Sequence, residues 1–469
     1  MDSTAQNTIQ FHLNGDPIAA TGNPGRLLLD YLRRDLRAVG TKEGCREGDC
    51  GACEVIYRAV PSCMLLLGHI RGGHVVTIEG LRTGPGLNLI QQAVVDQGGS
   101  QCGFCTPGFI VSFTGFVLNG TEFTVEEATH AISGNLCRCT GYVSLVRAAQ
   151  DMIAGLPTLP APGLKRNRAL VAASVLPAFF GKEFGAAESA NELQDSVTAN
   201  AWLGGGTDLI VQRGEAFNNE SPQFARSLRH TARIRVEEGE LCLPGETTFE
   251  ELRECTLLDE HWPTSRVDLE RFASPIIRER ASLAGNIANA SPIADGTAIF
   301  LGLGADVVLV GATGTRRVAL SEFFHGYKQI ELKPGERIAS LRLPKADPGH
   351  RFHFGKISKR EFLDIASINS AMGITVQSGV IQSARIAAGG VAPIPLVLRQ
   401  TAGALAGKPL NAQTVLDALP ALDAEIAPIS DVRGSAEYKR LGLRQLFFAH
   451  FLDLFPGEVD ESALLEFSR

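Results

Sequence analysis

Eight of the ten cysteines lie before residue 140, in two sets whose spacing suits metal chemistry. The first set has the spacing C-x4-C-x2-C and a fourth thiol nearby, and comprises Cys45, Cys50, Cys53 and Cys63. The second set is delivered as two close pairs, and comprises Cys102, Cys105, Cys137 and Cys139. Because thiolate binds zinc and iron-sulfur clusters strongly, both sets are candidate metal sites.

The first set has the plant-type ferredoxin spacing of a 2Fe-2S cluster. Glycines alternate with these cysteines, as a loop wrapped around an anionic cluster requires, because positive φ angles and close N-H approach come cheaply only with glycine. We expect Cys63 to be the fourth ligand, since thiolate completes the plant-type set. His69 and His74 are expected to be surface or core residues.

The second set leaves three alternatives to an iron-sulfur site, namely disulfides, ordinary buried thiols and a structural zinc. The first ten residues are polar and contain no apolar signal segment, which indicates a reducing compartment and disfavours disulfides. Zinc remains open for this set alone, because zinc ribbons also use separated cysteine pairs. Thr106-Pro107 and Thr140 predict a helix start after each pair, where negative charge is stabilised.

Composition limits the classes of partner. The chain has 469 residues, enough for about three domains, and a net charge of -7 from 44 basic and 51 acidic residues. Since no basic block and no membrane-length apolar run occur, we expect neither nucleic-acid binding nor membrane insertion. A soluble, cytoplasmic protein is expected, with Cys242 and Cys255 as buried core residues.

Two later segments are rich in glycine and short polar side chains. Three glycines and a threonine let backbone N-H groups approach an anion in the segment Leu203, Gly204, Gly205, Gly206, Thr207, Asp208 and Leu209, although an ordinary loop is equally consistent. Short hydrogen-bonding groups suited to a diphosphate recur in the second segment, at Ser282, Gly285, Asn286, Asn289 and Ser291. Ser291-Pro292 there predicts a helix N-cap, and a tight core turn is the alternative interpretation.

Together these motifs resemble the xanthine dehydrogenase and molybdenum hydroxylase family. The cysteine segments GTKEGC-x4-C-x2-C, QCGFCTPG and NLCRCTGY are similar to the two 2Fe-2S motifs of that family. The segments LGGGTDL and ASLAGNIANASPIAD look like the signatures of its FAD domain, in the expected order. One departure is that only nine residues separate Cys53 from Cys63, for which a shortened hairpin is the simple explanation.

The resemblance implies roles for individual residues. The segments at 204–207 and 282–291 would hold the FAD diphosphate, and Asp295 would contact the ribityl and flavin region. Lys356 matches the family lysine near the flavin ring, with a solvated surface lysine as the alternative. The run 389–393 matches another family element close to the cofactor.

The implied architecture is multidomain α+β. We expect a plant-type ferredoxin-like β-grasp domain at 8–84, a helical 2Fe-2S domain at 85–155 and a linker at 156–174. An α+β FAD-binding domain is expected at 175–345 and its C-terminal α/β subdomain at 346–469.

The implied function is electron transfer in a xanthine dehydrogenase that oxidises hypoxanthine and xanthine to urate. Electrons would pass from molybdopterin on a separate large subunit to the second cysteine set, then to the first set, FAD and NAD. A heterotetramer of two small and two large subunits is the family expectation. Two alternatives are the same part of a hydroxylase for an aldehyde or N-heterocycle, and a zinc-stabilised nucleotide-binding module.

Overall fold

The computed structural model describes residues 8–57, 59–183, 202–220, 222–224 and 233–467. It divides into two compact units. The first contains residues 1–196, 201–227 and 274–280, and the second contains 197–200, 228–273 and 281–469. Within the expected FAD-binding domain, residues 184–201, 221 and 225–232 lie outside the described part of the chain. The expected domain boundaries stay predictions.

The first unit begins with a small β-rich part. Strand β1 (Thr8–Leu13) pairs antiparallel with β2 (Asp16–Thr21) and parallel with β5 (His74–Val75), so the sheet order is β2-β1-β5. The Asn14-Gly15 turn joins β1 and β2. Alternate residues Ile9 and Phe11 pack on the short helices α1 (Leu28–Asp30) and η1 (Tyr31–Asp35), of which η1 is a π-helix. A second hairpin joins β3 (Glu54–Val55) and β4 (Val60–Pro61).

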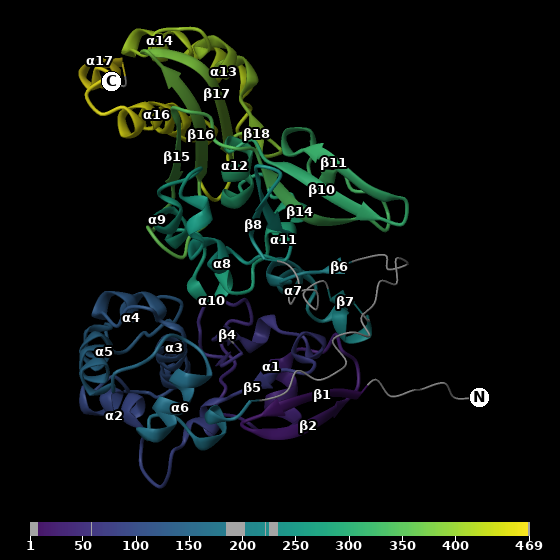
Figure 1. The fold of residues 1–469 in the computed structure, drawn as a ribbon, viewed down its shortest axis with the longest axis vertical. Coiled ribbons are helices and arrows are strands. Elements are labelled where there is room, and N and C mark those ends of the chain that lie inside the picture. The colour runs from purple at the N-terminus through teal and green to yellow at the C-terminus, as the bar shows by residue number, and fades with distance from the viewer. Residues whose placement is uncertain (1–7, 58, 184–201, 221, 225–232, 468–469) are drawn as a thin grey trace. The chain divides into compact units, whose positions relative to one another are not determined.

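A helical module makes up much of the rest of the first unit (Figure 1). It comprises α2 (Leu89–Asp96), α3 (Thr106–Asn119), α4 (Val125–Ala131) and α5 (Val143–Gly155). Every residue of α3 from 108 to 118 is buried, because α2, α4 and β3 all pack against it. A central helix surrounded in this way explains why its sequence is apolar on all sides.

One arginine links the segment after the helical module to that module by hydrogen bonds. Helix α6 (Leu164–Ala172) carries the buried Arg166, which donates to the carbonyls of Pro160 (2.7 Å), Leu118 (3.3 Å) and Gly120 (2.6 Å). The short elements β6 (Trp202–Leu203), α7 (Thr207–Arg213), η7 (Ala216–Asn219), β7 (Gln223–Phe224) and α10 (Pro275–Arg278) also belong to the first unit.

The second unit contains a five-stranded antiparallel sheet of order β11-β10-β14-β9-β8. Its strands are β8 (Arg235–Glu237), β9 (Glu240–Pro244), β10 (Asp306–Gly311), β11 (Gly314–Ala319) and β14 (Arg337–Leu343). Helices α8 (Phe249–Arg253), α9 (Ser265–Glu270), α11 (Leu283–Asn289) and α12 (Asp295–Gly302) share one apolar core with this sheet.

A four-stranded antiparallel sheet forms the rest of the second unit. It is ordered β15 (His350–Ile357), β16 (Ile368–Gln377), β17 (Val380–Gly389) and β18 (Leu396–Val397), and the first three strands run side by side in Figure 1. Ala371 belongs to the core with α12, whereas Met372 joins a core with the C-terminal helices. Residues 368–375 of β16 are all buried, because both faces of the sheet are covered.

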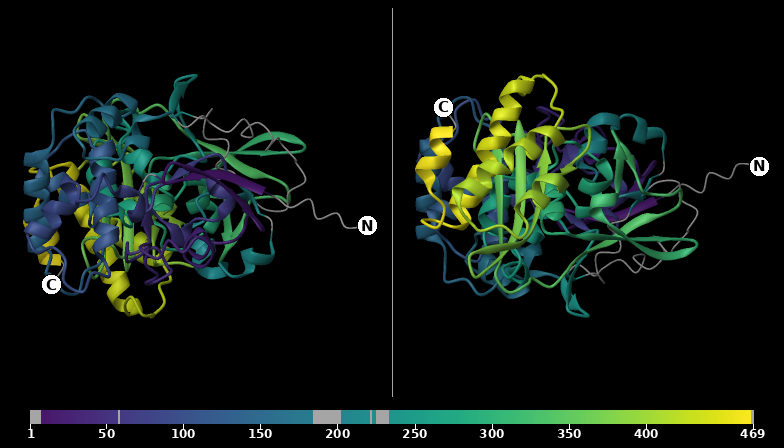
Figure 2. Two further views of the ribbon diagram at one scale, coloured as in Figure 1. Left: turned by 90° about the horizontal axis from the view of Figure 1, so that it is seen from below. Right: turned by 90° about the horizontal axis from the view of Figure 1, so that it is seen from above.

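The C-terminal helices are α13 (Arg399–Leu405), α14 (Ala412–Asp417), α15 (Leu419–Glu425), α16 (Ala436–Leu454) and α17 (Glu461–Phe467). The longest, α16, lies along β15 and β16, which both views of Figure 2 let the reader follow at the yellow end of the colour scale. The expected multidomain α+β class is confirmed. No helix among the described residues is long and apolar enough to cross a membrane.

Candidate functional site

The first cysteine set lies on a loop that ends in the β3–β4 hairpin. Cys45 and Cys50 form one hydrogen-bonded thiol pair, and Cys53 and Cys63 form a second. The hairpin turns the chain back, and Ser62 then donates to the carbonyl oxygen of Cys53 from its backbone N (3.1 Å) and its Oγ (2.8 Å). The short connection therefore still brings Cys63 beside Cys53.

Hydrogen bonds within this loop favour thiolate in one cysteine of each pair and the neutral thiol in the other. The backbone N of Glu47 donates to Cys45 Sγ (3.3 Å), and the backbone N of Cys45 donates to Cys50 Sγ (3.5 Å). The hydrogen bond with Cys50 lowers the pKa of Cys45 to about 5, and the same bond raises the pKa of Cys50. In the buried pair, the hydrogen bond lowers the pKa of Cys53 and raises that of Cys63. Thiolate is the form that binds metal.

The second set is paired across the chain rather than along it. The side chain of Cys102 bonds with that of Cys139, and Cys105 bonds with Cys137. Burial raises the pKa of Cys105 to about 12. Burial also opposes ionisation of Cys137, but its pKa is lowered because Thr140 donates to its Sγ from the hydroxyl (3.2 Å) and the backbone N (3.5 Å).

The helix starts beside this set differ from the expected caps. Cys105 itself is the N-cap residue of α3, while the Thr106 hydroxyl lies 2.8 Å from Ser100 Oγ and caps nothing. Tyr142, in a left-handed conformation, precedes α5. The prediction of Thr106 as a cap is therefore wrong, because its hydroxyl contacts Ser100 instead. Thr140 Oγ1 does accept from the backbone N of Tyr142 (3.3 Å), the residue before α5, and its hydroxyl also donates to a cysteine sulfur.

The chemistry of both sets fits a two-iron cluster. In a 2Fe-2S cluster each iron takes two protein ligands, and each set presents two thiol pairs. No three or more His, Cys, Asp or Glu side chains of the described chain form a group that could hold a single metal ion. Assignment of the eight cysteines as ligands stays a prediction.

The two cysteine loops touch each other inside the first unit. The backbone N of Leu136 donates to the carbonyl oxygen of Cys50 at 3.0 Å, and Leu136 directly precedes Cys137. One hydrogen bond thus joins a cysteine residue of the first set to the neighbour of a cysteine in the second. The expected structural histidines lie elsewhere: His69 packs edge-on against Phe224 with ring centroids 4.6 Å apart, and His74 accepts from the backbone N of Gly15 (3.1 Å).

The first glycine-rich segment, 203–209, forms the end of β6, a loop and the start of α7 in the first unit. Gly206 takes a φ of 72° as the residue before the helix. His69 Nε2 lies 3.3 Å from the Gly204 carbonyl oxygen, and buried Arg280 donates to the Gly205 carbonyl oxygen at 2.8 Å. Side chains from two other elements thus fix the carbonyl side of this loop.

The second segment, 282–295, belongs to the second unit. The side chain of Ser282 caps α11 by accepting from the backbone N of Gly285 (3.2 Å). Asn286 Oδ1 accepts from Thr297 (3.2 Å), and Asn289 Oδ1 accepts from Lys328 Nζ (2.9 Å). Ser291 does not cap a helix as expected, because α12 begins only at Asp295 with Ala294 as its N-cap.

Asp295 and Lys356 form a buried ion pair. Lys356 Nζ lies 2.8 Å from Asp295 Oδ2 and donates to the Arg271 carbonyl oxygen at 2.8 Å, and only 3% of its side chain is exposed. The alternative of a solvated surface lysine is therefore wrong. Removal of one partner from a buried pair costs about 3–5 kcal/mol, because the other charge is left uncompensated.

The sequence interpretation missed Asn369, which completes this site. Asn369 stands opposite Lys356 on β15 and opposite Gly389 on β17. Its Nδ2 donates to Asp295 Oδ1 (2.6 Å) and to the Ile293 carbonyl oxygen (3.0 Å). Its buried Oδ1 has no hydrogen-bond partner among the described residues. An asparagine in an otherwise apolar strand was the available signal, since buried polar groups need partners.

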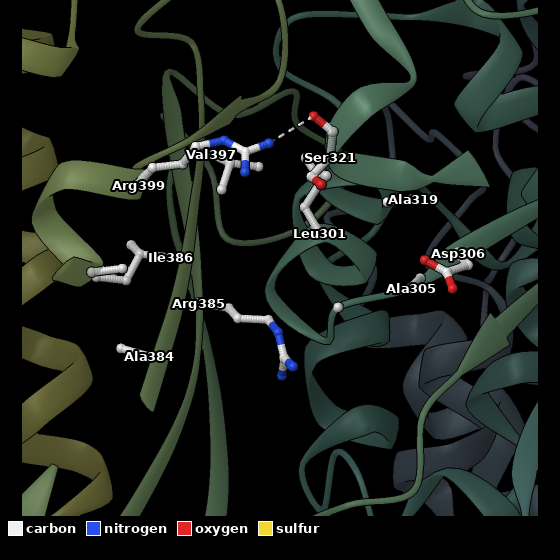
Figure 3. Close-up of a pocket in the computed structure, with 12 residues that line it drawn as sticks. Leu301, Ala305, Asp306, Ala319, Ser321, Ala384, Arg385, Ile386, Val397 and Arg399 are labelled. Atoms are coloured by element: carbon white, nitrogen blue, oxygen red, sulfur yellow. Dashed lines mark hydrogen bonds between the residues drawn. The ribbon is translucent and has the colours of Figure 1, made fainter. Parts of the chain in front are cut away.

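Two recesses lie in the second unit. One, of about 330 Å³, is lined by Arg271, Lys356, Ile357, Ser358, Lys359, Arg360 and Glu361. Figure 3 shows the other, of about 380 Å³, where Arg385 from β17 points toward the segment between α12 and β10 and Arg399 from α13 points toward Ser321. Lys356 makes the first recess relevant to the predicted FAD region, whereas no predicted site residue lines the second.

Replacement of Cys63 tests the fourth ligand of the first set. In Cys63→Ser we expect about two iron atoms per chain instead of about four, because one cluster is lost and the other retained. Iron analysis and the EPR spectrum of the reduced chain measure this. Cys255→Ser, at a half-buried cysteine outside both sets, is the matched control and should keep all the iron. Full iron content in Cys63→Ser would refute its role as a ligand.

Replacement of Gly389 tests the packing around Asn369. A Cβ at Gly389 would lie 2.4 Å from Asn369 Oδ1, so Gly389→Ala should lower the free energy of unfolding by about 1–3 kcal/mol and weaken FAD retention. Gly403→Ala in α13, where nothing lies within 4 Å of the added Cβ, should be neutral or slightly stabilising. Denaturant unfolding and flavin fluorescence check both; equal behaviour of the two variants would contradict the expectation.

Four family models match the chain in sequence. They are a 2Fe-2S iron-sulfur cluster binding domain at residues 11–64, a [2Fe-2S] binding domain at 77–150, an FAD binding domain in molybdopterin dehydrogenase at 185–346 and a CO dehydrogenase flavoprotein C-terminal domain at 353–454. The chain therefore contains two 2Fe-2S domains and an FAD-binding domain.

Individual relatives agree with this. A xanthine dehydrogenase from Emericella nidulans is 27% identical over 99% of this chain and 40% of its own length. Nicotinate hydroxylase from the same organism is 27% identical over 98% of this chain and 42% of its own length. The chain thus spans about two fifths of the length of these curated relatives.

Among solved structures, a carbon monoxide dehydrogenase from Hydrogenophaga pseudoflava is 25% identical, with a TM-score of 0.51 over 58% of this chain and 94% of that chain. That enzyme is described as lacking the Mo-pyranopterin moiety of the molybdenum cofactor. The cysteine sets, the FAD-binding domain and these similarities lead to one conclusion: the chain belongs to the molybdenum hydroxylase family and corresponds to its FAD and iron-sulfur part.

Proposed function

We propose that this chain is the electron-transfer subunit of an NAD-dependent xanthine dehydrogenase, working with a large subunit that carries molybdopterin. The observation that carries the electron-transfer role is the contact between the two cysteine loops, through the Leu136 N-H and the Cys50 carbonyl at 3.0 Å. FAD, when bound, supplies the conversion between single electrons and a hydride. The residues at 203–209 and 282–295, with Lys356, are the proposed FAD contacts.

The second cysteine set is the proposed entry point for electrons. Cys102 and Cys139 are exposed, whereas Cys53 and Cys63 of the first set are buried. Exposed apolar side chains surround the second set, namely Phe104, Leu136, Tyr142 and Val143. Apolar side chains beside exposed ligands suit a protein partner that excludes water and brings its own redox centre close.

A charge on this surface should weaken the partner complex. Val143 is 62% exposed and opens α5, so Val143→Asp is compatible with the helix start and with both cysteine sets. We expect co-purification with the molybdenum-bearing subunit from the native host to fall about tenfold, because a charge must be desolvated at the interface. Val432→Asp, at a residue 87% exposed in the second unit, is the control. Recovery of a full complex with Val143→Asp would contradict this surface.

The basic recess supports a dinucleotide as the acceptor. Four cationic side chains line it, at Arg271, Lys356, Lys359 and Arg360, against the single acid Glu361. Lys356 pairs with Asp295. Lys359 donates to the Val432 carbonyl oxygen (3.3 Å), and Arg360 donates to the Leu363 carbonyl oxygen (2.8 Å) and lies 3.9 Å from Asp364 Oδ2. Positive charge in a recess attracts phosphate groups, which NAD has and oxygen lacks.

Removal of one positive charge from the recess should weaken the use of NAD and leave the reduction of a neutral acceptor unchanged. In Lys359→Met we expect the KM for NAD to rise about tenfold, a change of about 1.4 kcal/mol, while reduction of a neutral dye is unchanged. Steady-state kinetics of the assembled complex measure both. Lys408→Met removes an exposed lysine that does not line the recess and serves as the control. An unchanged KM for NAD, or equal use of oxygen by the unaltered complex, would contradict the proposed acceptor.

A second candidate function is the same part of a molybdenum hydroxylase with another substrate. It is favoured by the nicotinate hydroxylase relative, whose sequence identity of 27% equals that of the xanthine dehydrogenase. Turnover of the assembled complex with xanthine, nicotinate and an aldehyde decides between them. Oxidation of xanthine with NAD supports the first candidate, and its absence with turnover of another substrate supports the second. The zinc-stabilised module is disfavoured by the two 2Fe-2S domain matches.

A further inference from the structure

Three polar side chains are buried together between the two cysteine loops. Glu54 directly follows Cys53, Ser112 lies on α3, and Asn135 comes two residues before Cys137. Each is at most 2% exposed. None of the three was predicted to take part in a site. All three belong to the first unit.

The three side chains contact one another in a closed ring. Ser112 Oγ bonds with Glu54 Oε2, Ser112 Oγ lies 2.8 Å from Asn135 Oδ1, and Asn135 Nδ2 lies 2.9 Å from Glu54 Oε1. A serine hydroxyl has one proton and can donate only once. If Ser112 donates to Asn135, the contact with Glu54 needs a proton on the carboxyl group.

The Glu54 carboxyl also needs a proton if the Asn135 amide is rotated by 180°, so that its oxygen and nitrogen exchange places. Asn135 would then donate to Ser112, Ser112 would donate to Glu54, and the remaining contact between two oxygens would again need a carboxyl proton. All three contacts are therefore satisfied together only when Glu54 is the neutral acid. When Glu54 is neutral, its carboxyl group, the Ser112 hydroxyl and the Asn135 amide each donate one hydrogen bond within the ring. The ring then carries no buried charge.

The ring is locked to the backbone of both loops. Asn135 Nδ2 lies 3.5 Å from the Gly51 carbonyl oxygen, and the Leu136 N-H bonds with Cys50. Gly51 has a φ of 69°, and a Cβ there would lie 2.3 Å from Asn135 Nδ2. A Cβ at Gly108, in the first turn of α3, would lie 2.3 Å from the Gly51 carbonyl oxygen. The two loops therefore approach each other as closely as glycine permits.

We infer that the Glu54, Ser112 and Asn135 ring is a latch that holds the two cluster-binding loops at the fixed separation through which electrons pass. Glu54 acts as a positioning residue: it contributes one donor and one acceptor, and it ties the residue after Cys53 to the segment before Cys137. The inference rests on the proposed passage of electrons between the two cysteine sets. It adds the device that fixes their geometry.

Conservative variants separate a neutral ring from a charged one. Glu54→Gln offers an N-H to Ser112 and an oxygen to Asn135, so it preserves all three contacts. Ser112→Ala removes a single oxygen and opens the ring at two contacts, and Glu54→Ala also removes two contacts, so that only the one between Ser112 and Asn135 remains. Thr114→Val is the matched control, since Thr114 is also buried on α3 but donates only within the helix, to the Ile110 carbonyl oxygen (2.7 Å).

The measurement is the EPR spectrum of the dithionite-reduced full chain, in which two nearby paramagnetic clusters split each other's signals. We expect the unaltered chain, Glu54→Gln and Thr114→Val to show the same splitting. Ser112→Ala and Glu54→Ala should keep full iron content but lose the resolved splitting, because the separation is no longer fixed.

Two results would overturn the latch. One is an unchanged splitting in Ser112→Ala, a variant that deletes only one atom and should fold. The other is loss of the splitting in Thr114→Val, which would show that any lost hydrogen bond on α3 has the same effect as opening the ring. Iron analysis separates these results from failure of the proposed function, since a chain without two clusters would lack both signals before any substitution.

Discussion

The first unit depends on close contact between two loops that each concentrate four thiols. Thiolates and the clusters they bind are anionic, and burial of like charges side by side is costly in a medium of low dielectric constant. Two features reduce this cost. The backbone N-H groups of Glu47 and Thr140 donate to cysteine sulfurs, and the Glu54, Ser112 and Asn135 ring carries no net charge. Stability and electron transfer therefore both require the two cysteine loops to stay in close contact.

The second unit solves a related problem with an ion pair. Lys356 and Asp295 come from β15 and the first turn of α12, and the register of the sheet places Asn369 opposite Lys356. Both faces of β16 are covered, so a polar group on this strand must find partners within the protein. Asn369 Nδ2 finds two of them, Asp295 Oδ1 and the Ile293 carbonyl oxygen, while its buried Oδ1 has no partner among the described residues. The result is a rigid cationic group beside the basic recess.

The sequence allowed the grouping of the cysteines and the helix starts beside the second set to be predicted because their information is local. Ligand spacing and turn residues depend on neighbours a few positions away. Glu54 and Ser112 are 58 positions apart, and Asn369 and Asp295 are 74 apart, so no spacing rule could join them. Lys356 was open to interpretation as a surface residue for the same reason.

Two predicted helix caps, Thr106 and Ser291, are wrong for a different physical reason. A threonine before a helix can cap it, but it can also bond with any other group within reach. Thr106 contacts Ser100 instead of a backbone N-H, whereas Thr140 both accepts from the Tyr142 N-H and donates to a cysteine sulfur. Ser291 stands too far ahead of the helix that begins at Asp295. Prediction of caps therefore requires knowledge of the site that surrounds them.

The most direct test of the account is a visible spectrum of the purified chain before and after dithionite, with iron, sulfide, zinc and flavin assayed on the same sample. The account predicts about four iron and four sulfide per chain, together with FAD, all bleached by the reductant. A colourless chain that holds zinc and no labile sulfide would contradict it.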